Sequence, residues 1–178
     1  MPLIPLALQA HAESRFADKA FIELCRTGTL QEVTNAIKNR ENVNTKTNNG
    51  ETPLMAAAQH NDNPKVITAL VKAGAGVNAR DKSGDTPLIF AAANPHTGVI
   101  TALVKAGADV NVKTNSGGLT PLILAAFSPN PEAITILLEA GADPKARDDS
   151  GRMAIDYATE NANLENTNAL RQLELASR

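Results

Sequence analysis

The sequence contains one cysteine, no tryptophan and few other aromatic residues, which make up 3% of its 178 residues. A single thiol cannot form an internal disulfide, so the cysteine count leaves the redox compartment open. With so few aromatic rings, the core must be built from alanine, leucine, valine and isoleucine. The hydrophobic share of 43% is ordinary for a globular chain and is compatible with such an aliphatic core.

The sequence also lacks an excess of charge and a long apolar run. Its 17 basic and 19 acidic residues give a net charge of -2, whereas a nucleic-acid-binding surface needs a net basic charge. No apolar stretch approaches the roughly 20 residues that a membrane-spanning helix needs. We therefore expect neither nucleic acid as the main partner nor a membrane span.

The N-terminus admits two interpretations. Residues 3–8 are mostly apolar and residues 10–12 fit the small-x-small cleavage pattern of an export signal, but no basic residue precedes Arg15. We assign residues 1–15 to a disordered tail or the remnant of an export signal, and residues 16–178 to a single repeat domain. An export signal predicts a periplasmic or secreted protein, and a disordered tail leaves a cytoplasmic location as the alternative.

A short motif recurs along the chain at a nearly constant spacing. Gly-x-Thr-Pro-Leu, followed by an alanine run, occurs three times, and a degenerate fourth copy follows. The threonines and the residue that replaces them in the fourth copy follow one another at intervals of 34, 34 and 33 residues: Thr52, Thr86, Thr120 and Met153. Two further motifs, Ala-Gly-Ala and Val-Asn, recur in step. Three motifs in register predict a repeat architecture with one structural unit per copy.

Each motif has a physical role. The threonine suits a helix N-cap, because its hydroxyl accepts a hydrogen bond from an unpaired backbone N–H. The proline after it fits the first helical position, where its missing N–H donor costs nothing. A second helix is expected in each unit, ended by the glycine of Ala-Gly-Ala in a left-handed conformation. These second helices are expected at residues 64–72, 97–105 and 131–139.

These motifs resemble the ankyrin repeat family over residues 18–173. The resemblance implies an all-α solenoid of helix–turn–helix units joined by hairpin loops. About five units are expected, because residues 21–39 resemble an N-terminal cap and residues 153–173 a C-terminal cap. Pro144 and Lys145 replace the Val-Asn motif in the fourth unit. The family implies a monomeric protein–protein interaction module rather than an enzyme, and a dedicated inhibitor or immunity-type protein that blocks one enzyme is the alternative.

The sequence offers no evident catalytic, metal or cofactor site. The histidines His11, His60 and His96 have no spacing typical of metal ligands. Cys25 has no evident His or Asn companion and lies in an apolar helical rhythm, which indicates a small buried hydrophobic residue. Tyr157 and the aspartate before it are interpreted, from the family resemblance, as structural parts of the last repeat.

The resemblance also implies a concave binding surface of hairpin tips and first helices. The family's variable positions give the predicted partner-binding residues Lys46, Asn48, Glu51, Arg80, Lys82, Asp85, Lys113, Leu119, Phe127, Arg147 and Arg152. Neighbouring variable positions include Gln59, His60, Ser83, Ala93, Asn94, Ser116 and Ser128.

Two features of this surface leave alternatives open. A basic residue recurs at the same position of each repeat: Lys46, Arg80, Lys113 and Arg147. This basic row is either a binding site for an acidic partner or a consequence of the family's preference for a polar residue at this position. Phe127 and Leu119 form an apolar pair that either anchors the partner, as aromatic residues often do at interfaces, or turns inward against the next unit.

Overall fold

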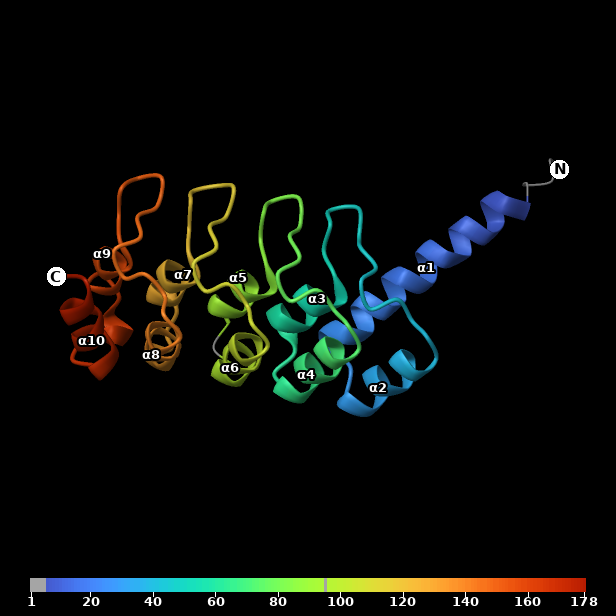
Figure 1. Cartoon of the computed structure of the whole chain (residues 1–178), viewed down its shortest axis with the longest axis horizontal. Helices are drawn as coiled ribbons and strands as arrows, with labels where there is room; N and C mark the ends of the chain where they lie inside the picture. Colours follow the sequence, from blue (N-terminus) through green and yellow to red (C-terminus); the bar gives the residue numbers. More distant parts are fainter. Residues whose placement is uncertain (1–5, 95) are drawn as a thin grey trace.

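The computed structural model describes residues 6–94 and 96–178 and shows an array of helix pairs (Figure 1). In chain order the helices are α1 (Leu6–Thr27), α2 (Leu30–Lys38), α3 (Pro53–His60), α4 (Pro64–Lys72), α5 (Pro87–Ala92), α6 (Thr97–Lys105), α7 (Pro121–Phe127), α8 (Pro131–Glu139), α9 (Ala154–Ala158), the 3-10 turn η1 (Ala162–Leu164) and α10 (Asn168–Ala176). The described residues contain no strand, apart from an isolated bridge between Arg147 and Met153.

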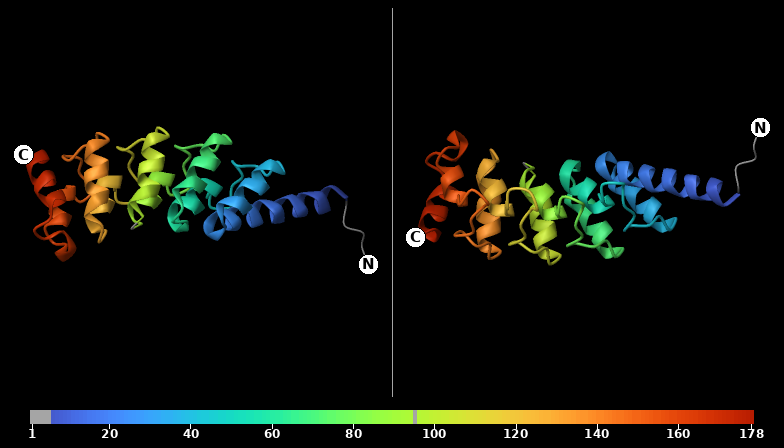
Figure 2. Two further views of the ribbon diagram at one scale, coloured as in Figure 1. Left: turned by 90° about the horizontal axis from the view of Figure 1, so that it is seen from below. Right: turned by 90° about the horizontal axis from the view of Figure 1, so that it is seen from above.

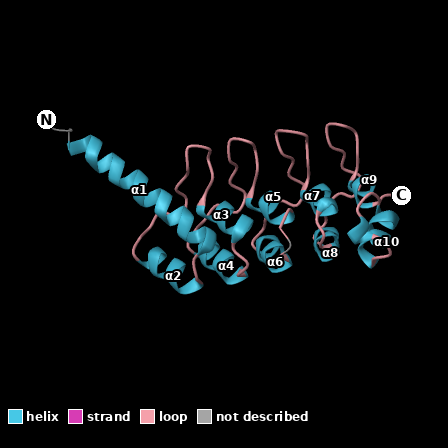
Figure 3. Ribbon diagram, turned by 180° about the vertical axis from the view of Figure 1, so that it is seen from behind, coloured by secondary structure: helices cyan, strands magenta, loops and turns pink. Residues whose placement is uncertain are grey.

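The helices form two rows, and the loops between successive pairs project to one side. The odd-numbered helices lie next to the loops and the even-numbered helices lie away from them (Figures 1 and 3). Seen from above and below, the pairs stack one behind another along a single axis, and the start of α1 extends beyond the array (Figure 2). The expected all-α solenoid with five helix pairs is confirmed for the described residues.

Local signals set the ends of the helices as the sequence predicted. The hydroxyls of Thr52, Thr86 and Thr120 accept hydrogen bonds from backbone N–H groups three residues later, at 3.2–3.4 Å. Each of these threonines precedes a proline at the first helical position. The bounds of α4, α6 and α8 equal the predicted second helices. Gly107, in the middle Ala-Gly-Ala motif, has a φ of 87°, the left-handed conformation that favours glycine at a helix end.

The core is a continuous aliphatic layer between the two rows of helices. The leucine of each Thr-Pro-Leu motif has a relative exposure of at most 1%: Leu54, Leu88 and Leu122. The alanine pairs that follow them are fully buried, so their small side chains allow the first helices of neighbouring repeats to approach closely. Each repeat packs on its neighbours, as expected for a solenoid whose stability comes from the repeats and their interfaces.

The asparagine of each Val-Asn motif couples its repeat to the next. The amide group of Asn44 donates to the carbonyl of Gly74 at 2.9 Å, and its side-chain oxygen accepts from the N–H of Gly76 at 2.9 Å. The same pair of bonds joins Asn78 and Asn111 to the following Ala-Gly-Ala segments. In the fourth unit Lys145 takes this position, where no further Ala-Gly-Ala segment follows. An asparagine at this position would have no following Ala-Gly-Ala segment to bind.

Helix α1 spans the expected domain boundary at residue 16. Helix α1 begins at Leu6, ten residues before the domain start expected at residue 16. The possible export signal at residues 3–8 begins outside the described residues, and the backbone is helical from Leu6 onward. The division of the chain at residue 16 stays a prediction.

Candidate functional site: the hairpin face

The loops and the first helices form one surface, which we call the hairpin face: the loops at residues 44–51, 78–85, 111–119 and 145–152 with helices α3, α5, α7 and α9 (Figure 1). Backbone hydrogen bonds tie each loop to the next. The N–H groups of Lys82, Asn115 and Asp149 donate to the carbonyls of Asn49, Ser83 and Gly117, at 2.9–3.0 Å. The loops therefore present their side chains from a connected framework.

The side chains of the predicted basic row donate hydrogen bonds to backbone carbonyls of the loops. The ammonium group of Lys113 donates to the carbonyl of Arg147 at 2.7 Å, and that of Lys46 lies 3.5 Å from the carbonyl of Arg80. The guanidinium of Arg80 donates to the carbonyls of Gly84 and Lys113, both at 3.2 Å. These side chains remain exposed, but their donors are engaged by neighbouring loops. Their recurrence thus has a structural cause that is independent of any partner.

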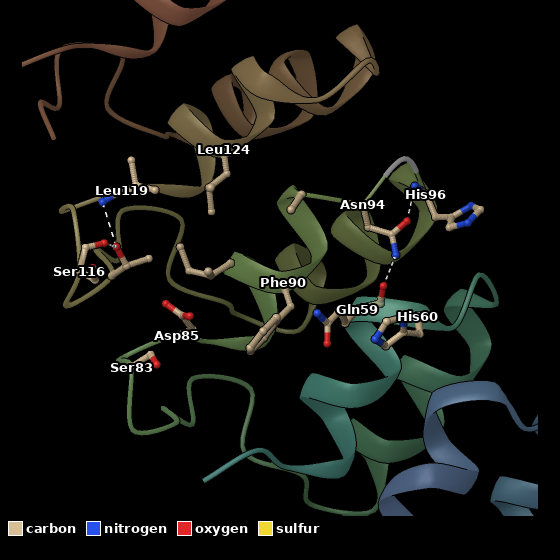
Figure 4. A pocket seen from close by; sticks show the side chains of 13 residues that line it. Gln59, His60, Ser83, Asp85, Phe90, Asn94, His96, Ser116, Leu119 and Leu124 are labelled. Carbon is tan, nitrogen blue, oxygen red and sulfur yellow. Dashed lines mark hydrogen bonds between the residues drawn. The ribbon is translucent and has the colours of Figure 1, made fainter. Parts of the chain in front are cut away.

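A cavity of about 680 Å³ opens on the hairpin face at the second and third repeats. Its floor contains the half-buried side chains of Phe90 and Leu124 (Figure 4). Asp85 and Leu119 line the side formed by the loops, and two histidines line the side near the turns between helices. The remaining lining residues come from the same loops and helix ends: Gln59, His60, Ser83, Ile89, Ala93, Asn94, His96, Thr114 and Ser116.

The cavity brings together part of the predicted surface. Asp85 and Leu119 line it, along with several of the neighbouring variable positions, including Gln59. Predicted residues that do not line it are Lys46, Asn48, Glu51, Arg80, Lys82, Lys113, Phe127, Arg147 and Arg152. Sequence reasoning missed Phe90 and Leu124. Their repeat position changes in size from alanine to large apolar residues, and this change is the signal that would have identified them: Ala56, Phe90, Leu124 and Tyr157.

The carboxyl group of Asp85 is half-buried and lies close to a second acidic side chain, that of Asp81. Its partial burial, and the negative charge of Asp81, raise the pKa of its carboxyl group above the ordinary value. Asp81 itself is engaged, because its carboxylate accepts from the N–H groups of Ser83 and Asp85, both at 2.8 Å. Among the described residues, no hydrogen bond or ion pair to the Asp85 carboxylate is present. The cavity therefore contains a negative charge that the chain leaves uncompensated.

Phe127 lies on a second part of the hairpin face, away from the cavity lining. It has a relative exposure of 55%, so it is not buried, although one side of its ring lies against the next unit. Its ring contacts Tyr157, with 4.3 Å between the centroids, and the guanidinium carbon of Arg152 lies 3.9 Å from the Tyr157 ring centroid. Leu119 lines the cavity instead. The predicted pair therefore contributes to two different parts of the surface.

Tyr157 and Asp156, the residues of the last repeat that resemble catalytic groups, both make hydrogen bonds within that repeat. The hydroxyl of Tyr157 donates to the carboxylate of Asp148, which lowers the pKa of the aspartate and raises that of the tyrosine. Asp156 accepts from the backbone N–H of Met153 at 2.8 Å. Both residues thus hold the last repeat together.

Cys25 is a free, buried cysteine. Burial raises the pKa of the Cys25 thiol to about 12, so its nucleophilic thiolate form is strongly disfavoured near neutral pH. Within residues 6–94 and 96–178, no three His, Cys, Asp or Glu side chains gather in a way that could hold a metal ion. No described helix is both long and apolar enough to cross a membrane.

The stacked helix pairs, their projecting loops and the asparagine bridges define a helical repeat solenoid. The chain belongs to the ankyrin repeat family: a model of ankyrin repeats in three copies matches residues 21–114, and a model of ankyrin repeats in many copies matches residues 103–158. The resemblance drawn from the motifs is confirmed. Comparison with curated protein sequences gives no match. Proteins with ankyrin repeats are generally protein–protein interaction modules and are typically non-catalytic.

Proposed function

We propose that the chain binds a protein partner through the hairpin face, with the cavity over α5 at the centre of the contact. The observation that carries this proposal is the composition of the cavity: an apolar floor of Phe90 and Leu124 beside the uncompensated carboxylate of Asp85. A concave apolar site with a few polar groups is typical of a binding site. No cofactor or metal is required, and a monomer presents the whole face.

Several predicted residues act as the border of this site. Lys82 and Asn48 are exposed at the loops. Glu51 is half-buried and lies 2.6 Å from the guanidinium of Arg26, so its charge is already paired within the chain. Phe127 offers an exposed apolar contact farther along the array. Such a face, with apolar residues at the centre and polar residues around them, has the anatomy of a protein interface.

A dedicated inhibitor that blocks one enzyme is a second candidate, and the ties between loops favour it. Because backbone bonds join each loop to the next, a partner would not need to order them on binding. Preorganisation of this kind favours tight binding of one matching surface. A single partner bound in a one-to-one complex would support the inhibitor, whereas several partners bound more weakly would support a scaffold.

Site-specific photocrosslinking in the native cell tests the binding face. A photoreactive amino acid is placed at Ser116, an exposed residue of the cavity edge, and in a matched variant at Thr68, an exposed residue of α4 away from the loops. Crosslinks to a protein from position 116 and not from position 68 are expected. Crosslinks that form mainly from position 68 would contradict the proposed face.

A further inference from the structure

Asp85 occupies a repeat position, directly before the capping residue, that is charged in three of the four repeats: Glu51, Asp85, Leu119 and Arg152. The other two charged residues each have an opposite charge within the chain. Arg26 Nη2 lies 2.6 Å from Glu51 Oε1, and Arg152 Nη2 lies 2.7 Å from Glu160 Oε1. In the described part of the chain, Asp85 is the charged member of this set that has no such ion pair.

The difference lies in one residue near the end of the first helix of the preceding repeat. The side-chain amide of Asn61 donates to the carbonyl of Cys25, the residue before Arg26. In the same way, the side-chain amide of Asn161 donates to the carbonyl of Ala126, the residue before Phe127. Arg26 and Phe127 therefore hold equivalent places at the end of a first helix. Phe127 lies seven residues after the capping residue Thr120, and the residue seven places after the capping residue Thr52 is Gln59, which carries no charge. His60, which follows Gln59, makes no ion pair with Asp85. Asp85 thus repeats the acidic half of the Arg26–Glu51 pair without its basic half.

The last repeat shows what an aromatic ring does at the position of Phe90. Tyr157 follows the capping residue by four positions, as Phe90 does in the second repeat. The guanidinium carbon of Arg152 lies 3.9 Å from the centroid of the Tyr157 ring. An arginine over a ring face is attracted by the negative charge of that face. Phe90 lines the cavity together with Asp85, so the second repeat combines a carboxylate and an aromatic ring (Figure 4).

We infer that the cavity over α5 binds an arginine side chain of a protein partner, with its guanidinium beside Asp85 and over the ring of Phe90. Elsewhere in the array the carboxylate at this position and the ring at this position each bind an arginine of the chain itself. Arginine suits the site because its planar, weakly hydrated guanidinium pairs with carboxylates and stacks on rings. Leu119 and Leu124 then provide apolar surface for the arginine's neighbours.

The charges around the cavity agree with a cationic occupant. The nearest cations of the basic row donate elsewhere: Arg80 donates to the carbonyls of Gly84 and Lys113, and Lys113 donates to the carbonyl of Arg147. Asp81 adds a second negative charge close to Asp85. The inference rests on the proposed function, since it names the partner group that this face recognises.

The probe is n-butylguanidinium, which reproduces the end of an arginine side chain, and its matched control is the uncharged n-butylurea. Each is titrated into the full chain while the amide NMR signals of Phe90 and Leu119 are followed. We expect saturable shifts with butylguanidinium and binding up to about fivefold weaker with butylurea, the size of one solvent-accessible charge interaction. Equal binding of the two probes, or no saturable shift with either, would overturn the inference.

Substitutions locate the binding site. Asp85→Asn should remove the preference for the charged probe, whereas Asp62→Asn, which removes a negative charge from an exposed turn outside the cavity lining, should keep it. Gln59→Arg should supply the missing basic half from within the chain and displace the probe. Gln59→Met, similar in length but neutral, should leave the preference for the charged probe in place. A preference that survives in Asp85→Asn or Gln59→Arg would contradict the site.

Thermal melts of all variants check that the loss of probe binding is not a loss of folding. The experiment is separate from the crosslinking test of the hairpin face. Crosslinking from position 116 without discrimination between the probes would reject the arginine site and leave the face intact. Crosslinking from position 68 instead would reject the face itself.

Discussion

The side-chain amide of Asn94 donates a hydrogen bond of 2.7 Å to the backbone carbonyl of Gln59, across the boundary between two repeats. Asn61 and Asn161 make the equivalent bonds at their own boundaries, to carbonyls of the preceding repeat. In the third repeat this place is taken by Ser128, which is 4% exposed. The hydroxyl of Ser128 accepts a hydrogen bond from the N–H of Asn130, two residues later, at 3.3 Å. The side-chain oxygens of Asn94 and Asn161 likewise accept from the N–H two residues later. Ser128 has no amide group, however, that could donate to the preceding repeat.

Ser128→Asn should therefore stabilise the boundary between α5 and α7. The new amide is expected to donate to carbonyls at the end of α5 and to raise the free energy of unfolding by about 1 kcal/mol, the usual net value of such a bond. Chemical denaturation measures the change. Ser128→Ala is the matched control and should lower stability, because the N–H of Asn130 loses its acceptor. A less stable Ser128→Asn protein would show that the boundary has no room for the amide.

Leu88→Ala should destabilise the array far more than Lys82→Ala. Leu88 is fully buried in the middle of the stack, and a large-to-small change in a core costs about 2–5 kcal/mol. Lys82 is exposed at the tip of a loop, where substitutions stay within about 0.5 kcal/mol. Denaturant unfolding of both variants checks the difference. Similar losses for the two would mean that stability is not carried by the buried layer.

Arg80→Ala should lower the stability of the array. Its guanidinium donates to the carbonyls of Gly84 and Lys113 in two successive loops, and losing such bonds costs about 1 kcal/mol. A thermal melt measures this loss of stability, with Lys82→Ala as the matched loss of a basic residue in the same loop. An unchanged melting temperature would mean that the basic row does not couple the loops in solution.

Asp85→Asn should gain stability relative to the wild type as pH rises from about 3 to 7. The folded chain raises the pKa of Asp85, whereas the unfolded chain keeps the ordinary value of about 3.9. Below that value both states bind the proton and no difference arises. At higher pH the folded state resists ionisation, so the wild type loses stability that the uncharged variant retains. Melts over this pH range test the sign, with Asp62→Asn as the charge-matched control. A variant that falls behind the wild type at pH 7 would show that the carboxylate is stabilised in the fold.

Phe127→Ala should chiefly increase the dissociation rate once a partner is identified. The ring is exposed on the hairpin face, and truncation of an aromatic anchor costs about 2 kcal/mol or more of binding energy. The Tyr157 contact adds a smaller folding cost of about 0.5–1.5 kcal/mol. Surface-bound kinetics measure the rate, and Leu175→Ala, exposed on α10, is the control. Unchanged binding together with a large fall in melting temperature would assign Phe127 to the fold alone.

Local signals made the repeat architecture predictable. A capping threonine and the proline after it act over a few residues and set the starts of α3, α5 and α7. A left-handed glycine just beyond the last helical turn sets the ends of α4, α6 and α8. The family and the fold class follow from the same motifs. The start of α1 was not predictable in this way, because it carries none of these capping motifs.

The sequence by itself determined the repeats, their register and the candidate surface positions, because each depends on a pattern of neighbours along the chain. Only the tertiary structure decided which of those positions are already paired within the chain. Glu51 is paired with Arg26 of α1, whereas the carboxylate of Asp85 has no ion pair among the described residues. Such pairings join residues about one repeat apart, and they depend on how successive units stack and how far their side chains reach.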